Sequence, residues 1–144
     1  MGRYFTLAEA ESALPTIEKA LRDALFLKAE YESAERDLQT ITRQVHLMGG
    51  MRVDSGKILE LRARKDTSSV ALKERFEELE EIGCLVKDLE VGLIDFPTLY
   101  HGTEVYLCWR FGEDHIEFWH GVEEGFRGRK PIDEEFRENH CGKS

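Results

Sequence analysis

The sequence predicts an α+β fold: a long, coiled-coil-like antiparallel helical hairpin with a small antiparallel β-sheet at its open end. Three observations predict it. Apolar residues recur at spacings of three and four along the first part of the chain, as they do in long amphipathic helices. Nine of the 14 aromatic residues follow position 83, in stretches that alternate between apolar and polar residues as strands do. Gly83 separates the two patterns, and glycine commonly ends a helix.

The apolar pattern predicts a first helix over about residues 7–48. Thr6 and Glu9 form a capping box at its start, in which each side chain accepts a hydrogen bond from the backbone of the other residue. The apolar seam contains no charged residue and comprises Leu7, Ala10, Leu14, Ile17, Leu21, Ala24, Leu27, Tyr31, Ala34, Leu38, Ile41, Val45 and Met48. At about 1.5 Å per residue this helix is roughly 60 Å long, which is too long to be buried in a small globule.

A second helix is expected over about residues 56–82, and either Asp54 or Ser55 can cap it. Its polar middle leaves open whether the helix is continuous through residues 62–69 or broken there. The short connection between the two helices makes them antiparallel. Because the second helix is too short to cover the whole first helix, residues 7–17 are expected to pack on the β unit.

The chain is expected to form one structural unit with three parts. Residues 1–83 form the helical hairpin, residues 84–132 form a β unit packed on the N-terminal part of the first helix, and residues 133–144 form a polar tail. The strands are expected at residues 85–88, 93–96, 104–111 and 115–120. Pro97 is expected to end the second of these strands, since proline lacks the amide hydrogen that a sheet uses.

The alternating pattern also predicts how the last two strands pair. If residues 113–114 form the turn, Trp109 faces Phe118 on the apolar side of the sheet. The same register places Arg110 opposite Glu117, where the two form an ion pair on the other side.

Composition narrows the possible partners. With 20 Lys and Arg against 29 Asp and Glu, the chain has a formal net charge of −9, so nucleic acid is not an expected partner. No run approaches the roughly 20 apolar residues of a membrane span, and no signal peptide precedes the first helix. The three cysteines form no CxxC motif and are odd in number, which indicates a reducing compartment. We therefore expect a cytoplasmic protein without membrane attachment.

Distinctive short motifs lie along the chain, and they are Thr6-Leu7-x-Glu9-Ala10, Gly83-Cys84-x-Val86-Lys87-Asp88-Leu89, Gly92-Leu93-Ile94-Asp95-Phe96-Pro97, Val105-Tyr106-Leu107-Cys108-Trp109-Arg110, Trp119-His120 and Glu124-Gly125-Phe126-x-Gly128-Arg129. Together they resemble an uncharacterised family of small bacterial proteins, known as a domain of unknown function. The resemblance extends over about residues 4–132. It implies a bacterial cytoplasmic protein of the architecture above, and it implies no activity.

Residue types that bind metals are concentrated in a 40-residue window and include His101, His115, His120, Cys84, Cys108, Asp88, Asp95 and Glu123. None follows the spacing of an HExxH motif or of paired CxxC motifs. A divalent-metal site would therefore be assembled from separate strands around His120. Its further ligands would be Asp88, Asp95 or Glu123. The alternative is a structural histidine that is hydrogen-bonded at the end of a strand.

Asp95 lies between Ile94 and Phe96 in an apolar strand, where an unpaired carboxylate is costly. It is either a general base or ligand, or a carboxylate satisfied by Arg110, Lys87 or backbone amides.

A ligand site on the β unit would be a shallow polar pocket. Its residues would be Asp95, Arg110, Glu117, His120 and Arg129. The glycine-containing loop over residues 121–130 can fold over this pocket. The predicted register places Cys108 and His120 on opposite faces of the sheet, which argues against a Cys–His catalytic dyad.

Two classes of function follow. The favoured one is an interaction or scaffold protein that acts through its helical hairpin, because no catalytic motif commits the chain to enzyme chemistry. The alternative is a small-ligand or metal-binding protein, enzymes included, with its site near Asp95, Arg110, Glu117 and His120. Phe26 lies away from the apolar seam, beside Leu25, and extends the apolar surface, so we expect a homodimer with helix faces in the interface.

Overall fold

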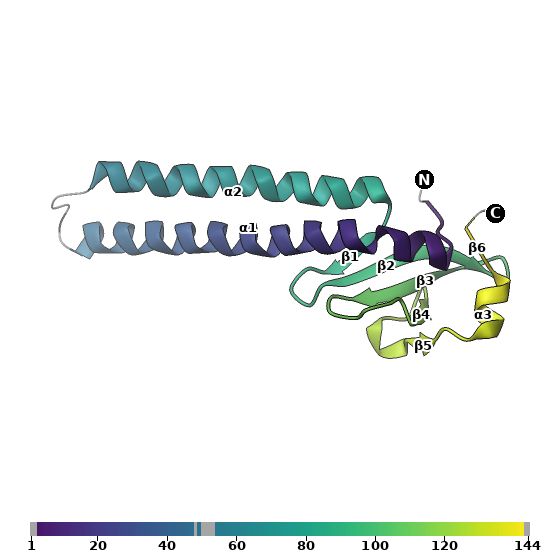
Figure 1. Cartoon of the computed structure of the whole chain (residues 1–144). Helices are drawn as coiled ribbons and strands as arrows, with labels where there is room; N and C mark the ends of the chain where they lie inside the picture. Colours follow the sequence, from purple (N-terminus) through teal and green to yellow (C-terminus); the bar gives the residue numbers. More distant parts are fainter. Residues whose placement is uncertain (1–2, 48, 50–53, 143–144) are drawn as a thin grey trace. The chain divides into compact units, whose positions relative to one another are not determined.

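The computed structural model describes residues 3–47, 49 and 54–142, and it confirms the predicted α+β fold (Figure 1). Helix α1 spans Leu7–Leu47 and helix α2 spans Ser55–Ile82. The second helix is continuous through its polar middle. The expected end of the first helix at Met48 and most of the connection that follows lie outside the described residues.

The chain divides into two compact units. The hairpin unit is Arg22–Phe76, and the sheet unit comprises Met1–Leu21 together with Glu77–Ser144. Each long helix therefore contributes to both units. Among the described residues, neither long helix has the continuous apolar stretch that crossing a bilayer requires.

The sheet unit contains six antiparallel strands, and five of them follow one another in sequence order. The strands are β1 (Leu85–Asp88), β2 (Leu93–Tyr100), β3 (Thr103–Arg110), β4 (Phe118–Gly121), β5 (Lys130–Pro131) and β6 (His140–Cys141). A short 3-10 helix, η1 (Phe126–Gly128), precedes β5, and helix α3 (Glu134–Asn139) precedes β6. The last strand, β6, returns to pair with β2.

One face of the sheet and the first turns of α1 share the hydrophobic core of the sheet unit (Figure 1). The sheet contributes the buried residues Ile94, Phe96, Val105, Leu107 and Trp109, and α1 contributes Leu7, Ala10, Leu14 and Ile17. These sheet residues alternate along β2 and β3, so every second side chain points toward the helix. The residues between them point to the other face.

The capping box at the start of α1 is confirmed. The amide of Glu9 donates to the Thr6 hydroxyl oxygen over 3.1 Å, and the Thr6 amide donates to the Glu9 carboxylate over 2.9 Å. A third contact comes from the far end of the chain, where Nε2 of His140 accepts from the Leu7 amide over 2.9 Å. The start of α1 is therefore tied to the C-terminal residues.

The sequence predicts a polar tail over residues 133–144, but the described part of it, residues 133–142, contains a helix and a strand instead. Asp133 caps α3 by accepting from the Phe136 amide, and the Phe136 side chain is fully buried. Its ring packs against Tyr100 and Trp119, with ring centroids 4.6 and 5.0 Å away. One aromatic residue in a polar stretch is a weak sequence signal, yet here it anchors the whole segment.

The predicted register of the last hairpin is wrong by one residue. Cys108, rather than Trp109, lies opposite Phe118, and Leu107 lies opposite Trp119. The cause is the connection, because β3 ends at Arg110 and β4 begins only at Phe118. Phe118 therefore shares a face with Cys108 and not with Trp109.

A longer connection replaces the expected two-residue turn because residues of the connection form a hydrogen bond with β3 and contribute to the core. The indole of Trp109 donates to the Glu113 carbonyl over 2.9 Å, and Ile116 is buried in the core. Glu117 lies in this connection and not on β4, so it does not pair with Arg110 across the sheet, and the expected cross-strand ion pair is also wrong.

Pro97 does not end its strand, which continues to Tyr100. On the side away from β3, the pairing with β1 stops at Asp95 and the pairing with β6 starts at Leu99. Pro97 occupies this gap, where no strand needs its missing amide hydrogen. Its carbonyl instead accepts from the Phe5 amide over 2.7 Å.

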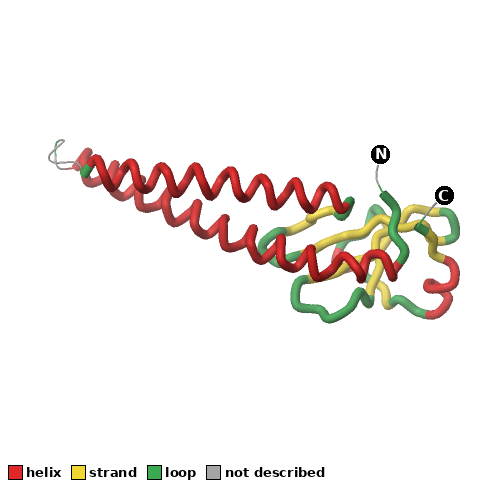
Figure 2. Tube along the Cα trace, turned by 45° about the horizontal axis from the view of Figure 1, so that its top comes forward, coloured by secondary structure: helices red, strands yellow, loops and turns green. Residues whose placement is uncertain are grey.

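In the hairpin unit, α1 and α2 run antiparallel side by side, as both views show (Figures 1 and 2). Arg64 of α2 pairs with Glu30 of α1 at 3.6 Å, and the Lys65 ammonium lies 5.5 Å from the ring centroid of Tyr31. The buried hydrophobic residues among the described part of this unit are Ala24, Ala34 and Leu61. Small residues at the seam let the helices approach closely but bury little apolar surface.

Truncating Phe136 tests whether the C-terminal segment belongs to the folded unit. We expect Phe136→Ala to lower the free energy of unfolding by about 3–5 kcal/mol, because the cavity it leaves is lined by rigid rings. Urea denaturation followed by tryptophan fluorescence measures this change. Arg137→Ala, an exposed change in the same helix, is the control and should shift stability by less than about 0.5 kcal/mol. Equal stability of the two variants would contradict the structural role of the segment.

Candidate functional site

Three side chains with reactive or metal-binding groups meet on the sheet face that points away from the core: Asp95 of β2, Cys108 of β3 and His120 of β4. Asp95 lies directly opposite Cys108. His120 lies opposite Tyr106, two residues along β3 from Cys108 and therefore on the same face. The ligand atoms of the three side chains all lie within 4.8 Å of one another. We call these three residues the buried cluster.

Burial is nearly complete at the buried cluster. The exposed fraction is 1% for Asp95, 0% for Cys108 and 2% for His120. Asp95 and His120 come from strands that flank β3, so their side chains meet across it. A cysteine at this position of β3 is small enough to lie beneath their contact.

The hydrogen-bond geometry of His120 indicates that a positive charge is needed between His120 and Asp95. Nδ1 lies 2.8 Å from the Gly121 carbonyl oxygen, which can only accept, so Nδ1 carries a proton. Nε2 lies 3.1 Å from each carboxylate oxygen of Asp95. A neutral ring protonated at Nδ1 would direct the Nε2 lone pair at an ionised carboxylate, which is repulsive. A proton or a metal ion between His120 and Asp95 removes this repulsion.

The Cys108 thiol is neutral in this environment. Burial, followed by the negative charge of Asp95, raises its pKa to about 12, although the Arg129 guanidinium acts in the opposite direction. At neutral pH the thiol keeps its proton. Cys108 is therefore not an activated nucleophile.

Arg129 lies beside the buried cluster, where it interacts with Cys108. Its Cζ atom lies 4.1 Å from the ring centroid of Phe118 and 4.1 Å from that of Phe126. Nη1 also lies 3.1 Å from a carboxylate oxygen of Glu113. Stacking between two rings and pairing with a carboxylate hold this cation in place.

The structure brings together only part of the predicted ligand site. Asp95 and His120 are in contact, and Arg129 lies near Cys108. The Arg110 guanidinium lies 5.8 Å from the Phe126 ring centroid, beside the same ring that Arg129 contacts. Glu117 is exposed in the connection before β4.

Only two of the four predicted metal ligands are brought together in the structure. Asp95 and His120 belong to the buried cluster, and Asp88 and Glu123 do not. The Asp88 carboxylate accepts from the Val91 amide over 3.2 Å, and Glu123 is exposed.

A shallow depression on the sheet unit includes Arg110, one of the five residues expected to line a pocket, and it does not include the buried cluster. A depression of about 270 Å³ is lined by Asp88, Val91, Leu93, Arg110 and Phe126. Asp95 and His120 are instead enclosed beneath neighbouring side chains. The depression beside Arg110 and the buried cluster are thus separate features of the sheet unit.

Cys108 and His120 share a face of the sheet, whereas the predicted register placed them on opposite faces. Cys108 lies between two apolar core residues along β3, just as Asp95 does along β2. Because side chains alternate along a strand, this pattern indicated that both residues point away from the core. The position of His120 depended on the length of the connection before β4, for which the alternating pattern carried no information. The role of Glu113 was missed for the same reason.

Residues 3–132 match the family described as Uncharacterized conserved protein (DUF2203). The chain belongs to the DUF2203 family. This confirms the resemblance to a domain of unknown function. The DUF2203 match includes all three residues of the buried cluster and ends before α3 and β6. No curated protein and no solved structure matches the chain.

Replacing His120 tests the charge requirement of the buried cluster. We expect His120→Leu to lower the free energy of unfolding by about 3–5 kcal/mol, because it leaves the buried Asp95 carboxylate without its partner. Asp95→Asn should cost less, since the amide nitrogen can donate to Nε2 of a neutral His120. Chemical denaturation of both variants measures the difference. A greater loss in Asp95→Asn than in His120→Leu would contradict the proton assignment.

Thiol labelling tests the environment of the cysteines. Burial raises the pKa of the Cys84 thiol to about 11, and that of Cys108 is about 12, so both are protonated and shielded at pH 8. We expect an aromatic disulfide reagent at pH 8 to modify Cys141, which is exposed, and to reach Cys84 and Cys108 only after unfolding. Cys141→Ser should abolish the rapid reaction. Rapid labelling of Cys108 in the native Cys141→Ser variant would show that the buried cluster is open.

Proposed function

We propose that the protein is a cytoplasmic interaction protein that forms a homodimer through its hairpin unit. The observation that carries this proposal is the poor burial of apolar side chains there. Phe26, Leu59 and Val70 are 66%, 67% and 60% exposed. A two-helix hairpin leaves part of its apolar surface open to solvent, and exposed apolar surface of this kind is typical of protein interfaces.

The outer side of α2 has a short apolar stripe, and Asp66 lies on the same face. Leu59 and Val70 are eleven residues apart, which is about three helical turns, so they lie on one face to within roughly 20°. The exposed Ala63 lies between them on the same face. A groove of about 400 Å³ beside Val70 is lined by Asp66, Thr67, Val70, Ala71 and Glu74. A stripe with an adjacent groove suits the packing of another helix.

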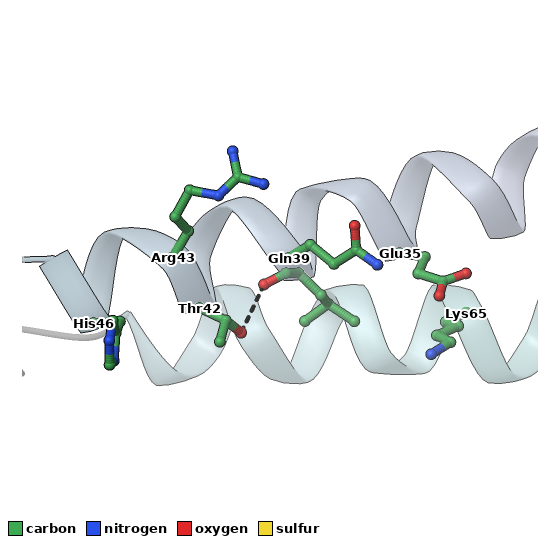
Figure 3. A pocket seen from close by; sticks show the side chains of 7 residues that line it. Glu35, Gln39, Thr42, Arg43, His46 and Lys65 are labelled. Carbon is green, nitrogen blue, oxygen red and sulfur yellow. Dashed lines mark hydrogen bonds between the residues drawn. The ribbon is translucent and has the colours of Figure 1, made fainter.

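A second groove, of about 530 Å³, lies between α1 and α2 (Figure 3). Leu38 lines it together with charged and polar residues. The side chains of Glu35 and Lys65 come from the two helices and lie at one end of the groove, and His46 lies at the other end (Figure 3). Both charge signs line the groove, so a helix with mixed charges can pair with it.

The charge distribution supports a second copy as the partner. The hairpin unit carries 11 Lys and Arg against 9 Asp and Glu, whereas the rest of the chain carries 9 against 20. Two hairpin units can therefore approach without strong repulsion, while two sheet units repel each other. A symmetric dimer also uses the same apolar stripe on both copies.

The proposed location and oligomer follow from sequence features that agree with one another. Cys84 and Cys108 are buried thiols that form no disulfide, which suits a reducing cytoplasm. The motif resemblance implies a bacterial source. The long heptad seam supports coiled-coil packing of α1 on α2 within each chain. The exposed Phe26 adds apolar surface for contacts between the two copies.

Placing charges on the α2 stripe tests the homodimer. We expect the wild-type protein to have twice the 16.7 kDa chain mass in light scattering at micromolar concentration. The double change Leu59→Glu with Val70→Glu should raise the dissociation constant more than about 100-fold, because it replaces buried apolar contacts with like charges on both copies.

The control is Val122→Glu, which places the same charge on an exposed apolar residue of the sheet unit. It should leave the dimer intact. Circular dichroism checks that all variants keep their helices. A wild-type mass of one chain, or equal dissociation by the control, would overturn the proposal.

A further inference from the structure

We infer that Asp95, Cys108 and His120 bind one divalent transition-metal ion of the zinc type, through a carboxylate oxygen, Sγ and Nε2. This inference does not depend on the proposed dimer, since the three residues belong to the sheet unit. It differs from the sequence-based metal set in that Cys108 replaces Asp88 and Glu123 as a ligand.

The donor atoms suit such an ion. Imidazole nitrogen, thiolate sulfur and carboxylate oxygen are the three ligand types that zinc takes in proteins, and a thiolate disfavours magnesium and calcium. Zinc–ligand bonds of about 2.0–2.3 Å place neighbouring ligand atoms roughly 3–4 Å apart. The 3.1 Å separation of Nε2 and the carboxylate already falls in this range, and all pairs lie within 4.8 Å. Small side-chain rotations complete the geometry.

His120 is oriented as metal-binding histidines are. Its Nδ1 donates to the Gly121 carbonyl over 2.8 Å, which fixes the tautomer and leaves Nε2 as the donor atom for a metal. The Nε2 atom faces the Asp95 carboxylate symmetrically, at 3.1 Å from each oxygen. Either a proton or a metal ion between Nε2 and the carboxylate satisfies this arrangement.

Charge balance selects a divalent ion. The ion takes the place of the Cys108 thiol proton, which is released to solvent on binding. Asp95 and the resulting Cys108 thiolate contribute two negative charges, which a divalent ion neutralises. The nearby Arg129 is already neutralised by Glu113 at 3.1 Å. A buried site is stable only when its charges are compensated in this way. The three protein ligands leave the fourth position of a tetrahedral ion for water or another small ligand.

Metal titration of the chelator-treated full chain tests the inference. We expect wild-type protein to bind one Zn²⁺ per chain in competition with a chromophoric chelator. Co²⁺ should bind at the same position and produce a near-ultraviolet sulfur-to-cobalt charge-transfer band. Cys108→Ser should abolish that band and weaken Zn²⁺ binding by more than the roughly 10–100-fold that loss of an outer-shell partner costs.

Matched variants separate the inference from non-specific binding and from misfolding. Cys84→Ser removes a buried thiol elsewhere in the sheet unit and should leave the band unchanged. Asp95→Asn keeps a hydrogen bond to His120, so it should fold while losing affinity for Zn²⁺. Circular dichroism and thermal melting confirm folding in each variant. The inference is overturned if wild-type protein binds no Zn²⁺, if the band persists in Cys108→Ser, or if folded Asp95→Asn binds as tightly as wild type.

Discussion

The pairing of β2 with β3 determines which side chains of the sheet unit meet. Eight residue pairs align the two strands without interruption, from Leu93 opposite Arg110 to Tyr100 opposite Thr103. Because side chains alternate between faces, this one register sends the apolar residues toward α1 and places Asp95 opposite Cys108 on the other face. A slip of one residue in either strand would move a carboxylate into the apolar core. The hydrophobic core and the buried cluster are therefore specified by the same hydrogen-bonded ladder.

Local signals in the sequence were sufficient for the fold class and for part of the buried cluster. The capping box at Thr6 and Glu9 depends only on residues three apart, and the structure contains it. Asp95 stood out because its neighbours in the strand are apolar. The partners of these residues depended on contacts far apart in the sequence. The length of the connection that buries Ile116 set the register of β4, and hence the position of His120. Periodicity within a strand contains no information of that kind.

The two units bury apolar surface in different ways. In the sheet unit, a strand that appeared to end at Pro97 continues, and a C-terminal segment returns to cover Tyr100 with Phe136. Both features depend on contacts between residues that are far apart in the sequence: Phe5 bonds to Pro97, and Phe136 packs on Tyr100. In the hairpin unit the seam is built from small residues such as Ala24 and Ala34, so the helices approach closely while larger side chains remain exposed. Apolar surface left on one chain is stabilised by contact with another, and for that reason we propose that association involves the hairpin unit.

The unequal charge of the two units bears on how a metal ion would be selected. The sheet unit and hairpin unit together hold 29 acidic residues, and 20 of these lie outside the hairpin unit. Such an excess raises the local concentration of any cation, but salt screens the attraction over about 8–10 Å and it does not distinguish one divalent ion from another. Selectivity requires specific donor atoms, and the combination of nitrogen, sulfur and oxygen in the buried cluster is of that kind. Surface charge would therefore concentrate cations around the sheet unit, whereas the β2–β3–β4 register decides which of them can be bound.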